Sequence, residues 1–127
     1  HNYINANNID GIRYVLQIIR EDRKYFGSIL LANQSIKDYV PQDSQSEAVE
    51  ELKKLFELTQ YKFIMQQDNN AIEAIKKIFN GSLTESEINM IPTFEEGECI
   101  LSIAGMKNIA MQIEITEEEQ RLFKGGR

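Results

Sequence analysis

Residue types that mark particular kinds of site are scarce in this sequence of 127 residues. One cysteine, Cys99, allows no internal disulfide, and one histidine, His1, allows no cluster of zinc ligands. Lysine and arginine number 14 against 20 acidic residues, and a net charge of -6 lacks the broad positive field that non-specific nucleic-acid binding requires. No apolar run approaches the ~20 residues of a membrane-spanning helix. These absences exclude a disulfide scaffold, a structural zinc site, a membrane span and a nucleic-acid-coating role for this segment.

What is present suits one compact domain. The sequence is 42% hydrophobic, and a chain of this length buries roughly two thirds of its unfolded surface. It has no internal repeats or low-complexity tracts, so we expect residues 1–127 to form a single domain. It opens at HNYIN without an initiator methionine, which leads us to expect a piece of a longer polypeptide.

The spacing of apolar residues predicts alternating helices and strands. A helical period predicts helices over 9–25, 44–58 and 70–79, a short helix from Thr84 and an acidic helix from Thr116. Short apolar runs predict strands at 28–33 and 61–66, and a period of two predicts a hairpin over 98–115 with one buried face. The run at 28–33, SILLAN, lacks polar alternation, which favours a strand buried on both faces. The predicted fold class is therefore α/β, with a partly parallel sheet flanked by helices and a C-terminal β-hairpin.

Polar residues at the predicted element ends support this organisation. Capping-box or cap spacing joins Ser44 with Glu47, Asn70 with Glu73, Thr84 with Glu87, and Thr116 with Glu119. Two short strands buried on both faces would leave open edges, so we expect at least one neighbouring strand outside this chain.

The chain lacks the motifs of nucleotide, nucleophilic or metal chemistry. The phosphate-binding pattern GxxxxGK[ST] does not occur. A catalytic triad needs a histidine in a folded cleft, whereas His1 is terminal and Cys99 begins an apolar strand. The acidic run at 117–119 falls in the first turn of a helix, where carboxylates stabilise the helix dipole. We therefore expect no nucleotide or metal ion to bind this chain by itself.

The segment RKYFGSILLANQS, residues 23–35, carries the most functional information. It joins a basic helix end, with Arg20, Arg23 and Lys24, to an apolar run that is followed by Gln34. A polar side chain at the carboxyl edge of a strand in an α/β sheet lies where ligands bind, and glutamine can orient a water or contact a phosphate there. Two structural alternatives stay open: Gln34 as a turn-capping amide, and the cations as a solvated helix face.

Several stretches of the chain resemble one family. HNYI, RKYFG, LANQS, FELTQYKFIM, IFNGSLTESE, EGECILSIAG and the EEEQRLF ending are similar to the C-terminal ATPase half of the large type IV secretion ATPase of conjugative elements, the TraC/TraE-like family. That family lies in the FtsK/HerA-like branch of RecA-fold motors, and the likeness covers essentially the whole chain. It implies a partial RecA-like P-loop NTPase fold, with the Walker A and Walker B motifs upstream of His1.

The family pattern RKxGG, followed by a strand ending in TQ, occurs here with two departures. Phe26 stands in place of the first glycine and Asn33 in place of the threonine. The arginine, the lysine, the second glycine and the glutamine of the pattern are retained.

The resemblance implies roles for these retained residues. Gln34 would be a catalytic sensor of the γ-phosphate, and Arg23 would be an arginine finger or sensor that acts on the nucleotide of its own or of the neighbouring subunit. Arg20 is a further catalytic candidate, and Lys24 would be a nucleotide-binding residue. An arginine suits the role of a finger because its guanidinium offers a planar, permanently charged fork to the charge that develops on a transferred phosphoryl group.

The parent implied by the resemblance is a bacterial, hexameric, ATP-driven motor of conjugation. ATP and Mg would be its cofactors, and other subunits of the same ATPase and type IV secretion channel proteins would be its partners. Its place would be cytoplasmic, peripheral at the inner face of the cell membrane. The family allows DNA contact in the parent, but the net charge of -6 does not support it for this segment.

Two other functions stay open at this point. One is a non-catalytic adaptor or protein-interaction module with a RecA-like half fold. The other is an enzyme that uses the acidic C-terminal half for metal-dependent chemistry, which the scattered carboxylates hardly support.

Overall fold

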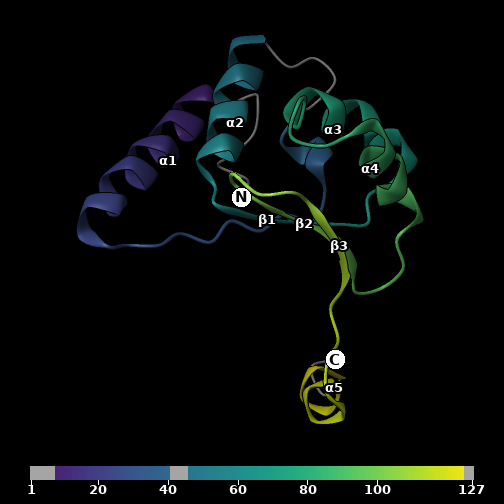
Figure 1. The fold of residues 1–127 in the computed structure, drawn as a ribbon. Helices are drawn as coiled ribbons and strands as arrows, with labels where there is room; N and C mark the ends of the chain where they lie inside the picture. Colours follow the sequence, from purple (N-terminus) through teal and green to yellow (C-terminus); the bar gives the residue numbers. More distant parts are fainter. Residues whose placement is uncertain (1–7, 41–45, 125–127) are drawn as a thin grey trace.

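The computed structural model describes residues 8–40 and 46–124, which place most helices on one side of a small sheet (Figure 1). The helices are α1 Ile9–Asp22, α2 Ser46–Leu58, α3 Ile72–Ile78, α4 Glu85–Met90 and α5 Glu117–Lys124. The strands are β1 Tyr61–Met65, β2 Glu98–Ile103 and β3 Ile109–Gln112. Short 3₁₀ turns occur at Arg23–Tyr25, Ile36–Asp38, Asn69–Ala71 and Ile91–Thr93. Over these described ranges, no helix combines the length and apolar character that crossing a membrane requires.

Helix α1 forms where the sequence predicts a helix, because its apolar residues share one face. The side chain of Asn8 accepts a hydrogen bond from the Gly11 N–H at 3.0 Å and so caps the first turn. Ile12, Leu16 and Ile19 recur at helical spacing and are buried. They place α1 beside α2 at the edge of the core.

One hydrophobic core joins α1, α2, α3 and the sheet. Its fully buried large side chains include Ile12, Leu52, Leu55, Ile75, Ile91 and Ile100. The ring of Phe56 on α2 makes edge contacts with two other rings, with its centroid 5.5 Å from that of Tyr39 and 5.1 Å from that of Phe79. Each large side chain that is buried stabilises the fold by about 1.5–3 kcal/mol. This core therefore supplies most of the stability of the molecule.

The three strands form an antiparallel sheet in the order β1-β2-β3. Phe63 pairs with Leu101, and Leu101 pairs with Ile109, which defines the register across the sheet. Ile64 and Ile100 form a pair on the other face, and both are buried in the core. Figure 1 shows α2, α3 and α4 on that side of the strands, with α5 lying well away from the body. The sheet thus has one face covered by helices.

The strand predicted at 28–33 is wrong, and with it the partly parallel sheet. Residues 27–33 have no regular secondary structure, and Ile29 and Leu30 are 42% and 92% exposed. A parallel strand is stable only when both of its faces are covered. The described part of the chain does not provide that cover, so the sheet keeps only its antiparallel pairs.

Two predicted capping boxes are confirmed. Thr84 and Glu87 form both reciprocal hydrogen bonds at the start of α4. At the start of α5, the Thr116 N–H donates to Glu119 Oε2 at 2.8 Å, and the Glu119 N–H donates to Thr116 Oγ1 at 3.2 Å. The Thr116 hydroxyl also donates to Glu119 Oε2, at 3.0 Å. The Thr116 N–H and, with a smaller effect, this hydroxyl hold the pKa of Glu119 below its usual value.

The other two predicted caps have different outcomes. The cap at Asn70 is wrong, because Asn69–Ala71 forms a 3₁₀ turn and no side chain caps α3, which begins at Ile72. The cap at Ser44 lies outside the described residues and stays a prediction.

The predicted hairpin is confirmed, but its outer strand is not buried as expected. β2 and β3 pair around a turn in which Gly105 has φ 78°. Asn108 donates to the Ser82 carbonyl at 2.8 Å, which attaches the turn to the chain before α4. Ile109 and Ile115, predicted on the buried face, are 47% and 49% exposed. The alternation is present, but the face that carries Ile109 is the one that the helices leave open.

Candidate functional site

The four predicted site residues lie along one exposed stretch of chain. Arg20 is in the last turn of α1, and Arg23 and Lys24 are in the 3₁₀ turn that follows. Gln34 lies at the other end of the irregular segment, where Gln67, two residues after β1, hydrogen-bonds to its carbonyl. All four residues are exposed. Their side chains are therefore available to a group outside this chain.

Arg20 and Lys24 come together in a groove between α1 and α2. The groove has a volume of about 560 Å³ and is lined by Arg13, Leu16, Gln17, Arg20, Glu21, Lys24, Glu51 and Lys54. Arg13 pairs with Glu47 of α2 at 2.7 Å, and Lys54 pairs with a carboxylate of its own helix at 3.0 Å. Arg20 and Lys24 have no such ion pair within residues 8–40 and 46–124. They are the two cations that the groove leaves available to an anion.

Arg23 does not line this groove. On a helical path Arg20 and Lys24 are four residues apart and share a face, whereas Arg23 is about 100° from Lys24. Arg23 is exposed as the first residue of the 3₁₀ turn. The structure thus separates the two arginines that the sequence places in one basic cluster.

The chain leaves this basic helix end through a left-handed residue, Phe26, at φ 57°. The Gly27 N–H donates to the Asp22 carbonyl at 2.8 Å, which is one of the bonds of a Schellman helix end. Glycine is favoured at such a position because it has no Cβ. The Phe26 side chain is fully exposed, so no packing offsets the cost of about 1–2 kcal/mol for this conformation. The backbone here is the one that a glycine in the RKxGG pattern would favour.

The backbone around Gln34 is held by the side chain of Gln67, which follows β1. Gln67 Nε2 donates to the Gln34 carbonyl at 3.2 Å, and Gln67 Oε1 accepts the Ile36 N–H at 2.9 Å. The Gln34 N–H donates to Asn33 Oδ1 at 2.8 Å. The side-chain amide of Gln34 makes no hydrogen bond to any residue that the structure describes. Gln67, and not Gln34, is therefore the capping amide at this turn.

Asn33 links the same turn to the core. Its side chain hydrogen-bonds with Tyr39, whose ring packs edge-on against Phe56. Burial raises the pKa of Tyr39, and the hydrogen bond with Asn33 acts in the opposite direction. The residue before Gln34 is thus fixed, while the amide of Gln34 itself extends free of partners among the described side chains.

Sequence reasoning missed Gln67 and the α2 side of the groove. Gln67 follows the apolar run of β1 as Gln34 follows the run at 28–33, and this parallel placement of two glutamines was the available signal. Glu51 and Lys54 carried no signal, because tertiary packing decides which face of α2 meets α1. The predicted residues also stay divided: Figure 1 shows an extended stretch of chain between the end of α1 and the turn that carries Gln34.

The sequence offers this site no phosphate-binding loop. Holding ATP requires a loop of backbone N–H groups and a lysine around the phosphates, and the sequence has no GxxxxGK[ST]. Within the described ranges, no group of three or more His, Cys, Asp or Glu side chains is placed to hold a metal ion. What the site offers is exposed cations and an amide, which can contact a phosphate that is held elsewhere.

These features define the class of the fold as an α/β unit with an antiparallel three-stranded sheet. No protein-family model matches the sequence. The structure is similar to that of VirB4 of Thermoanaerobacter pseudethanolicus, with a TM-score of 0.70 and 24% identity over 92% of this chain and 29% of that chain. The sequence is similar to that of an uncharacterized protein of Bacillus anthracis, at 37% identity over 126 residues, which are 99% of this chain and 20% of that protein.

The structural likeness shows that this chain has the α/β fold of one part of VirB4. The chain spans about three tenths of VirB4 and a fifth of the Bacillus protein. Both proteins to which it is similar are therefore several times longer.

Proposed function

We propose that this chain is the C-terminal part of a RecA-like ATPase domain in a longer motor, which hydrolyses ATP to energise conjugative DNA transfer by type IV secretion. The observation that carries the proposal is the structural likeness to VirB4, because it extends over 92% of the chain. The motifs RKYFG, LANQS and EGECILSIAG support it independently, since they resemble the large type IV secretion ATPase.

In this proposal Arg23 is the arginine finger or sensor, and Gln34 senses the γ-phosphate. Their exposure supports these roles, because a group that acts on a nucleotide bound outside this chain must be accessible. Arg20 is the second candidate for the finger, and Lys24 contacts the nucleotide phosphates. Since Arg20 and Lys24 share a groove from which Arg23 is absent, the two arginines contact different groups.

The remaining components lie outside these residues. ATP and Mg²⁺ bind at Walker motifs upstream, the other subunits of a hexamer are the immediate partners, and channel proteins of the secretion system are further ones. The motor works at the cytoplasmic, inner face of the cell membrane. The outward position of Arg23 supports its action on the nucleotide of a neighbouring subunit, where it would stabilise charge on the transferred phosphoryl group.

The proposal is tested by comparing this chain of 127 residues with the longer polypeptide that contains it. Titration calorimetry with ATP and Mg²⁺ and a phosphate-release assay should show binding and hydrolysis by the longer polypeptide. The 127-residue chain should show neither, because it has no phosphate-binding loop. Micromolar binding to the short chain would contradict an upstream site. A folded longer polypeptide without ATPase activity would favour the adaptor function instead.

A further inference from the structure

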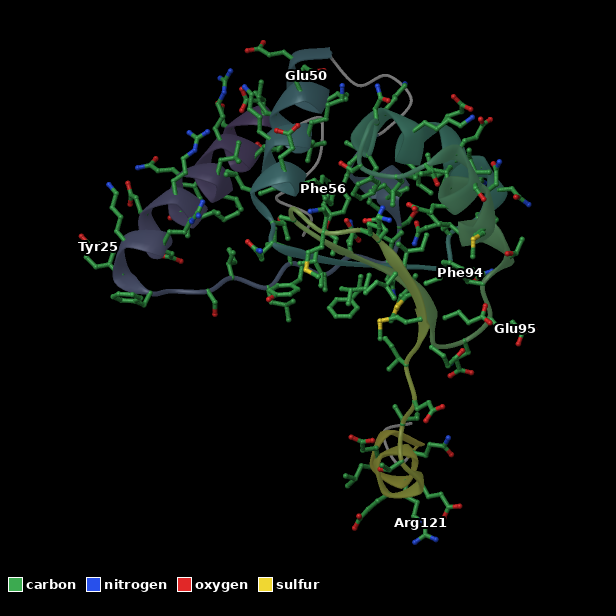
Figure 2. The ribbon with its side chains drawn as sticks, viewed as in Figure 1. Tyr25, Glu50, Phe56, Phe94, Glu95 and Arg121 are labelled. Atoms are coloured by element: carbon green, nitrogen blue, oxygen red, sulfur yellow. The ribbon has the colours of Figure 1, made fainter. Side chains whose placement is uncertain are left out.

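One face of the sheet is apolar across all three strands, and no helix of the described ranges covers it (Figure 1, Figure 2). Register and alternation place on it Tyr61, Phe63 and Met65 of β1, Cys99, Leu101 and Ile103 of β2, and Ile109 and Met111 of β3. We call these residues the open face. None of them is charged. Figure 2 shows side chains projecting from the strands on the side away from α2 and α3, with no described helix over them.

The outer strands of the open face expose apolar side chains that a folded chain would be expected to bury. Tyr61 is 60% exposed, Phe63 56% and Met65 47%, whereas Ile64, between them on the opposite face, is 8% exposed. The central strand β2 is better covered, because Cys99 is buried and Leu101 and Ile103 are half-buried. Monomeric proteins rarely leave a large contiguous apolar patch in water, and such a patch marks an interface. The absence of charged side chains suits an apolar protein surface rather than a phosphate backbone.

We propose that the open face is an internal packing surface, covered in the longer polypeptide by an apolar surface from the part of the same chain outside these 127 residues. This inference rests on the proposed function in one respect only, because both require a longer polypeptide that contains this chain. The length of the similar proteins supports it. The matched region is 20% of the Bacillus protein and 29% of VirB4, so each has ample chain to supply a second layer.

A cover from the same chain is favoured over a second copy on physical grounds. A partner joined by a short flexible linker has an effective concentration of order mM, which exceeds ordinary protein concentrations. The segment at 27–33 supports the same conclusion, because its apolar residues Ile29 and Leu30 are also exposed. Both surfaces need apolar contacts that residues 8–40 and 46–124 do not supply.

Two methionines provide a test that needs no substitution. Met65 on the open face and Met90 on α4 are 47% and 39% exposed, so hydrogen peroxide should oxidise both to sulfoxides in the 127-residue chain. In the longer polypeptide, oxidation of Met65 should slow about tenfold or more, because a buried site reacts only after local opening. Met90 should react at nearly the same rate in both. The rates are measured by peptide mass spectrometry over a range of protein concentrations.

Each result supports or overturns the inference. Equal oxidation of Met65 in the two polypeptides would overturn it. Protection of Met65 that appears in the short chain as its concentration rises would assign the open face to a second copy and would also overturn it. ATP hydrolysis is measured on the same longer sample, so the two proposals fail separately. If Met65 is protected but ATP is not hydrolysed, the packing surface is supported and the proposed motor function is rejected. If ATP is hydrolysed but Met65 is not protected, only the packing surface is rejected.

Discussion

The helical body of the molecule and the segment that carries the proposed site are stabilised in different ways. The body buries Leu52, Leu55 and Ile75 almost completely, and its helices pack on one another and on the sheet. The site segment, residues 20–34, is exposed along nearly its whole length and is attached mainly at its ends. The body therefore folds on information within this chain. Within the site segment, residues 28–33 have the apolar composition of a buried element, but the described residues do not bury them.

The largest expected effect concerns the site segment. If Arg23 stabilises the transferred phosphoryl group, Arg23→Ala in the longer polypeptide should lower ATP turnover by about 10³ to 10⁵. Its thermal midpoint should change little, because Arg23 is exposed. Arg13→Ala on the same helix is the control and should lower turnover far less. It removes an exposed ion pair with Glu47 and one wall of the groove, and it leaves Arg20, Arg23 and Lys24 in place. Equal losses in the two variants would show that α1 is simply a charged surface.

The second prediction compares the stability of the two regions directly. Ile75→Ala removes a side chain with 0% exposure from the core and should lower the free energy of unfolding by about 2–5 kcal/mol. Leu30→Ala, at 92% exposure, should change it by less than about 0.5 kcal/mol. Urea unfolding of the 127-residue chain measures both. A large loss in Leu30→Ala would show that the site segment is packed in solution and would remove the contrast.

The same contrast explains how much could be predicted from the sequence. Elements governed by local signals were predicted correctly: α1 from its apolar spacing, α4 from the pair Thr84 and Glu87, and the hairpin from its alternation. Such signals act between neighbours in the chain and need no distant partner. The run at 28–33 has the composition of a buried strand. Composition alone does not predict whether a neighbouring strand or a covering layer lies within the same 127 residues.

The roles of the four candidate site residues stay predictions, and the geometry around them could not be predicted from the sequence. The exposed basic helix end and the exposed Gln34 were expected from their positions beside apolar runs. The groove that contains Arg20 and Lys24 forms only where α1 meets α2. The hydrogen bond from Gln67 to the Gln34 carbonyl likewise joins distant parts of the chain. No local pattern encodes these contacts.

The third prediction separates the two glutamines of this turn. If Gln34 is a sensor, Gln34→Ala in the longer polypeptide should slow single-turnover hydrolysis by about 10² to 10³, with ATP binding nearly unchanged. Its stability should stay the same, because its amide has no partner among the described residues. Gln67→Ala should lower stability by about 1–2 kcal/mol, since it removes the bonds to Gln34 and Ile36. A destabilised Gln34→Ala with normal turnover would remove Gln34 from the site.

The smallest predicted effect concerns the junction between the two regions, where Phe26 holds a left-handed conformation at φ 57°. Phe26→Gly should raise the free energy of unfolding by about 1 kcal/mol or slightly less. It relieves the Cβ clash, although it also increases the entropy of the unfolded chain. No packing is lost, because the Phe26 side chain is 100% exposed. Gly81→Ala is the reverse control: at φ 83°, with open space where the new Cβ would lie, it should lower stability by a similar amount. Thermal or urea unfolding of the two variants measures both changes in stability.

A destabilising effect of Phe26→Gly would contradict this prediction. It would show that the Phe26 ring packs against other residues in solution. The basic helix end would then belong to the packed body rather than to the exposed segment.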